Sequence, residues 1–291
     1  MSNQLPDVQQ HGIFHRRFGD VVVTAISDGH IQAALGVFQG ITAEQGEAEL
    51  ARAFRPSPPS FAVNVFVVRA AGRTALIDAG GGDIYPAAGR MMAALAACSI
   101  APESVDTVLL THTHRDHVRG LVDAHNKVRF ANARVLVHQA DLDFFLDPAK
   151  AEGMPAPIAT TFPVVEASLR PYGDQVVGFR GEVELFPSVS SVELPGHTPG
   201  HCGFAVGGRD GVLIWGDVMH LPEVQAAYPD ATLVFDFDGA QAAASRRKTL
   251  ELAASERLLV GGMHLHFPGL AHVVRRDAAF AVVPEPWTSA Y

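Results

Sequence analysis

Three histidines and one aspartate lie within six positions of the chain, in the segment Thr111-His112-Thr113-His114-Arg115-Asp116-His117. Imidazole nitrogens and carboxylate oxygens are the ligands that zinc and similar divalent metals prefer in proteins. Side chains of this kind form poor cores, and burying several of them together is costly unless they share a partner. The segment therefore predicts a metal site.

The spacing within this segment suggests two metal ions rather than one. His112 and His114 alternate, so their side chains leave the same face of an extended chain. Asp116 and His117 follow after a turn and can therefore face a second point a few ångströms away.

The elements around the segment indicate an α/β chain. An apolar run from Val105 to Leu110 is typical of a buried strand that would hold the histidines at its end. Strands are expected in two groups, and each group is followed by helices. One of these helices begins after Asp238, which is expected to be its N-cap. This order is consistent with two sheets packed face to face and helices outside, an αββα four-layer sandwich. We expect a single domain over 1–291, because this length and a hydrophobic fraction of 48% suffice for one large core.

Composition and charge exclude several classes of partner. The net charge is −9 with no basic run, which disfavours a nucleic-acid partner. Two cysteines do not make a disulfide framework. The first residues lack the pattern of a secretory signal, and no apolar run is long enough to span a bilayer. We therefore expect a cytoplasmic protein with no membrane partner.

The histidine segment resembles the H-x-H-x-D-H signature of the metallo-β-lactamase-fold hydrolases. Further matches follow in the order of that family and extend the resemblance from about Phe18 to His272. They are the turn Leu194-Pro195-Gly196-His197-Thr198-Pro199-Gly200-His201, the strand ends at Asp217 and His264, and the earlier Asp78. The resemblance implies the αββα topology, which periodicity alone would not fix.

The same resemblance implies a ligand set. One ion would take His112, His114 and His197, the other would take Asp116, His117 and His264, and Asp217 would bridge the two. Asp78 would hold a ligand imidazole by its other nitrogen, whereas His201 is expected to be structural. The expected cofactor is a pair of Zn²⁺ ions, although oxygen and nitrogen ligands also admit manganese, cobalt or iron.

Within the family, the chain most resembles the methyl parathion hydrolase-like branch, with N-acyl homoserine lactonases as relatives. This resemblance implies a hydrolase that opens a lactone or a related ester, with Asp116 and Asp217 catalytic and phosphotriester cleavage as a side activity. The alternatives are an organophosphate or aryl-ester hydrolase, a thioesterase of the glyoxalase II type, and a non-catalytic metal-bearing binding protein. The thioesterase needs a basic region, and the only candidate, Arg246-Arg247-Lys248, falls on what resembles a solvated helix face.

A substrate pocket and a partner subunit are also predicted. His220, three residues after Asp217, is expected to line the pocket, and Ala151 to Tyr172 is expected to cover it. The predicted pocket wall consists of Tyr85, Phe144, Phe145, Phe267 and Leu270. Family habit implies a homodimer, which the arm from Gln4 to Phe14 could help to form.

Overall fold

The computed structural model describes residue 9 and residues 12–289, and within them the chain forms sixteen strands and eight α-helices. The strands are β1 (Ile13–Phe18), β2 (Val21–Gln32), β3 (Phe38–Gln39), β4 (Ser60–Ala70), β5 (Arg73–Ile77), β6 (Thr107–Leu109), β7 (Arg134–His138), β8 (Val176–Phe179), β9 (Glu184–Phe186), β10 (Val189–Glu193), β11 (Cys202–Val206), β12 (Val212–Ile214), β13 (Thr232–Leu233), β14 (Leu259–Gly261), β15 (Leu270–Arg276) and β16 (Ala279–Pro284). The helices are α1 (Ala43–Arg52), α2 (Met91–Ala97), α3 (Arg115–Val118), α4 (Gln139–Phe145), α5 (Ala156–Ala159), α6 (Phe162–Leu169), α7 (Pro222–Ala227) and α8 (Gly239–Ser255).

Two large sheets carry most of the described chain. The first has the order β1-β2-β4-β5-β6-β7-β8, antiparallel from β1 to β5 and parallel from β5 to β8. The second has the order β16-β15-β14-β12-β11-β10-β9, in which β12 and β14 are parallel and the other pairs antiparallel. Parallel neighbours present their carboxyl ends at the same sheet edge, so β5, β6, β12 and β14 can deliver side chains to a common place.

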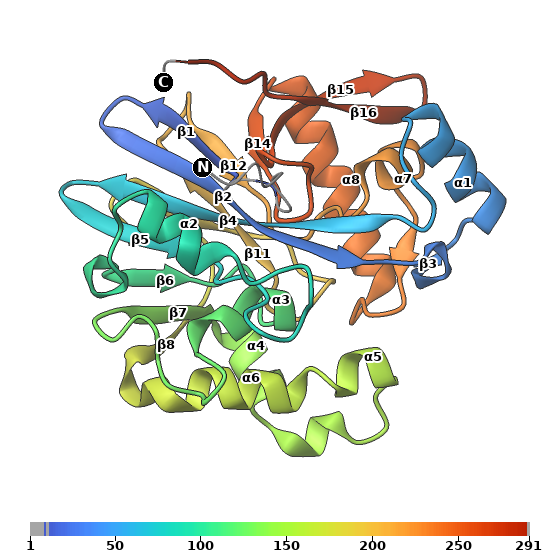
Figure 1. The fold of residues 1–291 in the computed structure, drawn as a ribbon. Helices are drawn as coiled ribbons and strands as arrows, with labels where there is room; N and C mark the ends of the chain where they lie inside the picture. Colours follow the sequence, from blue (N-terminus) through green and yellow to red (C-terminus); the bar gives the residue numbers. More distant parts are fainter. Residues whose placement is uncertain (1–8, 10–11, 290–291) are drawn as a thin grey trace, which may run out of the picture.

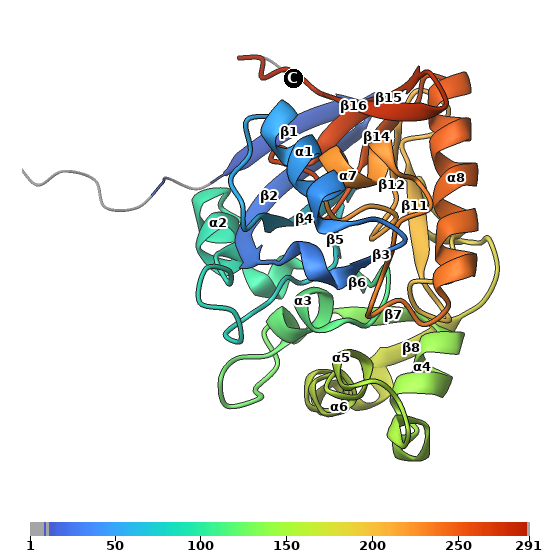
Figure 2. The same cartoon turned by 90° about the vertical axis from the view of Figure 1, so that its right-hand side faces the viewer.

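Three apolar cores separate four layers, which confirms the predicted αββα sandwich. One core lies between the first sheet and helices that include α2 and α6, and it contains Leu95 and Phe162. The second lies between the two sheets, where Phe66 meets Phe204. The third lies between the second sheet and α8, which contributes Leu250. Figure 2 shows α2 and α8 on opposite sides of the paired sheets.

The colours of Figure 1 show that earlier strands, up to β8, build one sheet and later strands, from β9 on, build the other. Strands β4 and β5 form an antiparallel hairpin in which Ala70 pairs with Arg73. Helix α2 begins at Met91. The antiparallel pair β15 and β16 was not predicted.

Two further expectations concern the ends of the chain and membranes. Most of the arm from Gln4 to Phe14 lies outside the described residues, and the described part includes Ile13 and Phe14, which pair with β2. Among the described residues, every helix is too short or too polar to span a membrane.

Candidate metal centre

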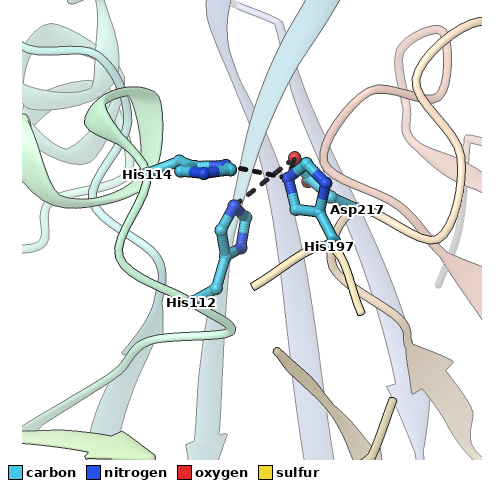
Figure 3. Close-up of side chains that lie close together, drawn as sticks. All are labelled: His112, His114, His197 and Asp217. Atoms are coloured by element: carbon cyan, nitrogen blue, oxygen red, sulfur yellow. Dashed lines mark hydrogen bonds and ion pairs between the residues drawn. The ribbon is translucent and has the colours of Figure 1, made fainter. Parts of the chain in front are cut away.

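The seven side chains expected to bind metal converge from the ends of strands in both sheets. His112 and His114 follow β6, and Asp116 and His117 lie in the first turn of α3. The other three come from the second sheet: His197 lies in the turn between β10 and β11, Asp217 follows β12 and His264 follows β14. Figure 3 shows four of them, His112, His114, His197 and Asp217, pointing toward one another.

The first group, His112, His114, His197 and Asp217, places its ligand atoms within 4.8 Å of one another. His114 Nδ1 lies 2.8 Å from His197 Nε2. Asp217 Oδ2 lies 3.3 Å from His197 Nε2 and 3.5 Å from His112 Nε2. All four side chains are buried. These atoms therefore surround one point.

In the second group, Asp116, His117 and His264 also place their ligand atoms within 4.8 Å of one another, and the two histidines approach the same Asp217 oxygen as the first group does. Asp217 Oδ2 is 3.3 Å from His117 Nε2 and 3.1 Å from His264 Nε2. Asp116 Oδ2 is 3.5 Å from His264 Nε2 and 3.7 Å from His117 Nε2. Asp217 thus contacts both groups, as the expected bridging carboxylate would.

The bonding of these atoms fits a divalent metal pair. His112 Nε2, His117 Nε2 and Asp217 Oδ1 are buried and make no hydrogen bond with any described residue. Buried polar atoms without partners are costly and rare in native proteins. Nitrogen lone pairs that converge on a carboxylate oxygen also repel one another unless cations lie between them. Bound cations would remove both costs.

Three of the expected ligand histidines donate a hydrogen bond from Nδ1, so that Nε2 of each ring faces the candidate centre. Nδ1 of His117 donates to Asp78 Oδ2 at 2.7 Å, and Nδ1 of His264 donates to the Ala62 carbonyl at 2.6 Å. Asp236 accepts from Nδ1 of His197 at 2.7 Å. Such outer contacts fix the imidazole tautomer and orient the ring toward a metal. Asp78 therefore contacts the imidazole of His117, one of the expected ligands, whereas the pairing of Asp236 with His197 was not predicted.

Charge is distributed unevenly around the centre. Burial opposes the charged form of His117, but Asp217, Asp116 and Asp78 outweigh it and raise its pKa well above the usual value. Burial also opposes ionisation of Asp217, yet His117, His264 and His112 hold its pKa well below the usual value. The carboxylates therefore make the centre electronegative, which suits cation binding.

Two residues behind Asp217 are structural. His201 Nδ1 donates to the Leu194 carbonyl at 2.7 Å, and its Nε2 accepts from the Asp217 backbone N–H at 2.9 Å, which confirms the structural role expected for it. Burial lowers the pKa of His201 to about 3, so the ring stays neutral and can accept this bond. Gly216 has a φ of +60°, and a Cβ there would lie 2.6 Å from His201 Nε2. Only glycine fits this turn.

A buried carboxylate ties the two histidine-bearing loops together. Asp141 accepts from the Thr113 backbone N–H at 3.0 Å and from the Thr198 hydroxyl at 3.0 Å. It also accepts from the Gly200 backbone N–H at 2.7 Å. Asp141 thereby fixes the loop of His112 and His114 against the turn of His197. The sequence offered no signal for this role, because an aspartate at the start of a short helix is usually a cap.

A family model described as the metallo-beta-lactamase superfamily matches residues 59–274. The chain belongs to that superfamily. Its His/Asp cluster is compatible with a dinuclear metal site.

Relatives of this superfamily chain differ in how much of it they match. The structure of hydrolase AbOPH in the beta-lactamase superfamily has a TM-score of 0.89 at 26% identity, with 97% of this chain and 100% of that one covered. A structure of AidC, described as a dizinc quorum-quenching lactonase with a product bound, has a TM-score of 0.87 at 24% identity, with 96% and 99% covered. The hydroxyacylglutathione hydrolase of Acidiphilium cryptum (strain JF-5) is 31% identical over 144 residues, 50% of this chain. The chain spans about half the length of that curated relative, 47%.

A pocket of about 580 Å³ opens onto the metal centre of this superfamily member. Its floor includes His114, Asp116, Asp217 and His264. The predicted pocket residues His220 and Tyr85 line it, and Pro157 and Thr161 reach it from the segment expected to cover the site. Most of the remaining wall is apolar and was not predicted: Ile31, Ala33, Ala34, Val37, Phe61 and Phe235.

Four of the predicted pocket residues do not line this pocket. Phe144 and Phe145 are buried in the core beneath α6, where both rings contact Phe162. Leu270 belongs to the core between the sheets and to a separate hollow beside α7 and β16. Phe267 is 39% exposed. The sequence shows that these side chains are large and apolar, but their direction depends on packing that it does not reveal.

In the basic cluster on α8, Arg247 and Lys248 are exposed, as the prediction of a solvated face requires, but Arg246 is buried. Arg246 is 1% exposed and donates to the carbonyls of Val218, Pro229 and Ala231. Arg247 pairs with Asp230 at the surface. Arg246 is therefore a structural residue that holds the backbone just after Asp217.

Proposed function

We propose that this chain is a dinuclear metal-dependent hydrolase that opens a lactone or cleaves a related ester with an apolar substituent. One ion would bind His112, His114 and His197, the other Asp116, His117 and His264, with Asp217 between them. The observation that carries the proposal is the position of these two ligand groups at the floor of an apolar-walled pocket. Zn²⁺ is the expected metal, and the choice of a lactone follows the sequence resemblance.

The pocket chemistry favours hydrolysis by water. The described residues that line it include no serine or cysteine, so the chain offers no side-chain nucleophile of these types there. When bound, two divalent ions lower the pKa of water and polarise an ester carbonyl. The apolar wall formed by Ile31, Val37, Phe61 and Phe235 would bind an acyl or aryl group and exclude bulk water.

The chain's own groups would complete the reaction. Asp116 lies in the pocket, and its side chain is 13% exposed, so it faces both the ligand group and the substrate space. It would accept the proton that the attacking water gives up and pass it to the alkoxide that leaves when the ester bond breaks. Arg115 and Tyr85 line the same pocket, with the guanidinium carbon 5.8 Å from the ring centroid. They would orient the polar part of the substrate.

The thioesterase alternative loses its expected binding region. Glutathione carries carboxylates that require free cationic groups, and the basic cluster on α8 was the candidate. The Arg246 guanidinium is buried on three carbonyls, and that of Arg247 is paired with Asp230. The apolar wall of the pocket likewise suits an acyl or aryl group better than a charged peptide.

Hydrolysis by the metal-loaded protein tests the proposal. The panel is a long-chain N-acyl homoserine lactone, an aryl ester, an aryl phosphotriester and S-lactoylglutathione, each followed by proton release. We expect the highest kcat/KM with the lactone or aryl ester and loss of turnover after chelation. Fastest cleavage of S-lactoylglutathione would establish the thioesterase instead. Inertness toward the whole panel with two ions bound would indicate a binding protein, and turnover that survives complete metal removal would overturn the mechanism.

A further inference from the structure

A fifth imidazole converges on the central carboxylate and belongs to neither expected ligand group. Asp217 Oδ2 has five imidazole Nε2 atoms between 3.0 and 3.5 Å away. Four of them belong to His112, His117, His197 and His264. The fifth, His220 Nε2, is the nearest, at 3.0 Å.

The His220 ring is buried and lacks hydrogen bonds. The residue is 2% exposed, and both ring nitrogens make no hydrogen bond with any described residue. A buried imidazole of this kind is costly unless something binds it. The nitrogens of His112 and His117 that face the centre share this property. His220 therefore resembles the expected ligands more than an ordinary pocket residue.

The surroundings of His220 aim its ring at the centre. The ring stacks on that of His264, with centroids 4.7 Å apart and planes at 24°. Phe61 and Phe235 contact it edge-on, at 5.6 and 5.4 Å. These apolar rings leave the Asp217 side as the polar direction open to Nε2.

Hydrogen bonds also fix the backbone at His220. Gln225 Oε1 accepts from the His220 backbone N–H at 2.7 Å, and Gln225 Nε2 donates to the Ala231 carbonyl at 3.2 Å. Arg246 donates to the Val218 carbonyl within the same turn. A ligand held in place before the ion arrives loses little entropy on binding.

Two side-chain atoms that bind the same metal ion lie at a characteristic distance from each other. Zinc binds nitrogen and oxygen ligands at about 2.0–2.2 Å, so two ligands of one ion, 90–110° apart, lie roughly 3.0–3.5 Å from each other. The separation of 3.0 Å between His220 Nε2 and Asp217 Oδ2 falls in this range. Asp217, His220 and His264 also place their ligand atoms within 4.8 Å of one another.

We infer that His220 is an additional ligand of the metal centre, binding through Nε2 beside Asp217 and His264. This inference rests on the proposed metal pair but not on the identity of the substrate. The ion on the Asp116 side would then have five protein donors, namely Asp116, His117, Asp217, His220 and His264, whereas the other ion would have four. The two ions would therefore differ in affinity and in the number of positions left for water or substrate.

Replacing both metal ions with Co²⁺ shows directly, in the wild-type protein, whether His220 binds metal. Each imidazole bound to Co²⁺ gives a strongly shifted, exchangeable ring N–H signal in the proton NMR spectrum. If His220 binds metal, the dicobalt protein shows six such signals, one each from His112, His114, His117, His197, His220 and His264. Five signals would overturn the inference, and they would do so whether or not any variant folds.

A matched pair of variants gives a second readout. His220→Phe keeps an aromatic ring beside Phe61 and Phe235 but removes both nitrogens. We expect one of the two ions to bind at least about tenfold more weakly in a chelator competition titration, with the shifted N–H count reduced by one. Ile31→Val, which changes the same pocket wall at a residue that is not one of the rings around His220, should bind both ions as the wild type does.

The outcomes separate this inference from the proposed function. If His220→Phe binds both ions with wild-type affinity and the wild-type N–H count, His220 only lines the pocket. If the wild-type protein takes up no metal, the inference and the proposed metal centre both fail. If it takes up two ions with six shifted signals but hydrolyses nothing on the panel, the ligand stands and the proposed function fails.

Discussion

His197 has a carboxylate on each side of its ring, Asp217 at Nε2 and Asp236 at Nδ1. Burial opposes ionisation of Asp236, but the hydrogen bond and charge of His197 hold its pKa below the usual value. Asp236 therefore stays ionised at neutral pH and fixes the tautomer that leaves Nε2 free. We expect Asp236→Asn to weaken metal binding about 10–100-fold while the fold is kept.

A chelator competition titration measures this change, and a neighbouring aspartate supplies the control. Asp238, two residues further on, caps α8 by accepting from the Gln241 backbone N–H. Asparagine caps a helix about as well as aspartate, so Asp238→Asn should leave metal affinity unchanged. Equal affinities in the two variants would show that the contact between Asp236 and His197 does not support the metal centre.

A second residue gives a pH dependence of stability with a definite sign. Asp83 accepts from Arg119 Nε at 2.6 Å and from its terminal nitrogen at 3.1 Å, and this pairing lowers the pKa of Asp83. A carboxylate with a lowered folded-state pKa adds stability above its unfolded pKa of about 3.9 and loses it as the pH falls through the folded value. We therefore expect Asp83→Asn to be less stable than the wild type by a constant amount from pH 5 to 8. The difference should shrink only below about pH 4.

Urea denaturation of the chelated proteins tests this pH dependence, because chelation removes the separate effect of acid on metal binding. A stability difference that grows as the pH falls from 8 to 5 would contradict the assigned sign.

At the residue scale, the sequence identified the side chains that form the His/Asp cluster but not all of those that orient them. Each of His112, Asp217 and His264 stands out because it follows a short apolar strand. Asp236 and Asp141 carry no such signal, since an isolated aspartate near a helix start resembles a cap. Asp238 is in fact a cap, whereas Asp236, two positions earlier, pairs with His197. Only the structure separates these roles.

Helix α8 shows what an element contributes to the site. Its Arg246 is buried and donates to three carbonyls, two of which belong to the loop before β13 and one to the turn that follows Asp217. Burial lowers its pKa only to about 10, so the guanidinium remains charged at neutral pH. Hydrogen bonds to charged groups stabilise more than neutral ones, and buried carbonyls left without donors are costly.

We therefore expect Arg246→Met to lower the unfolding free energy by about 3 kcal/mol or more. The adjacent Arg247 pairs with Asp230 at the surface, and Arg247→Met should change stability by no more than about 1 kcal/mol. Urea denaturation curves of both variants measure the contrast. Similar losses of unfolding free energy in the two variants would contradict the structural role of Arg246 and would support the solvated position that the sequence suggested.

The elements that the sequence missed are those whose pattern is weak. β6, β12 and β14 are fully buried three-residue runs with a continuous apolar signal. β15 ends in Val274, Arg275 and Arg276, all exposed, so the alternation typical of a strand is absent there. Its pairing with β14 and β16 stabilises it instead. This is a tertiary effect that a local pattern does not contain.

Across the whole molecule, the ligands of each proposed ion come from both sheets. His112, His114, Asp116 and His117 follow the first sheet, whereas His197, Asp217 and His264 follow strands of the second. Sequence periodicity predicted strands but not which of them are neighbours, and the family resemblance supplied that topology. The apolar pocket wall could not be predicted, because it joins segments as distant as Ile31, Phe61 and Phe235.

Metal removal tests the molecule as a unit. Ions that bridge the two sheets bind the folded chain and not the unfolded one, so they stabilise it by about 2.7 kcal/mol for each site filled at a hundred times its Kd. For a chain of this size, each kcal/mol corresponds to roughly 2–4 °C in Tm. Chelation should therefore lower Tm by several degrees or more. The apolar core shared by the two sheets should keep unfolding a single calorimetric transition in both forms, as proposed for one domain over 1–291. An unchanged Tm would argue that the ions do not join the sheets, and two separate transitions would argue that the halves fold independently.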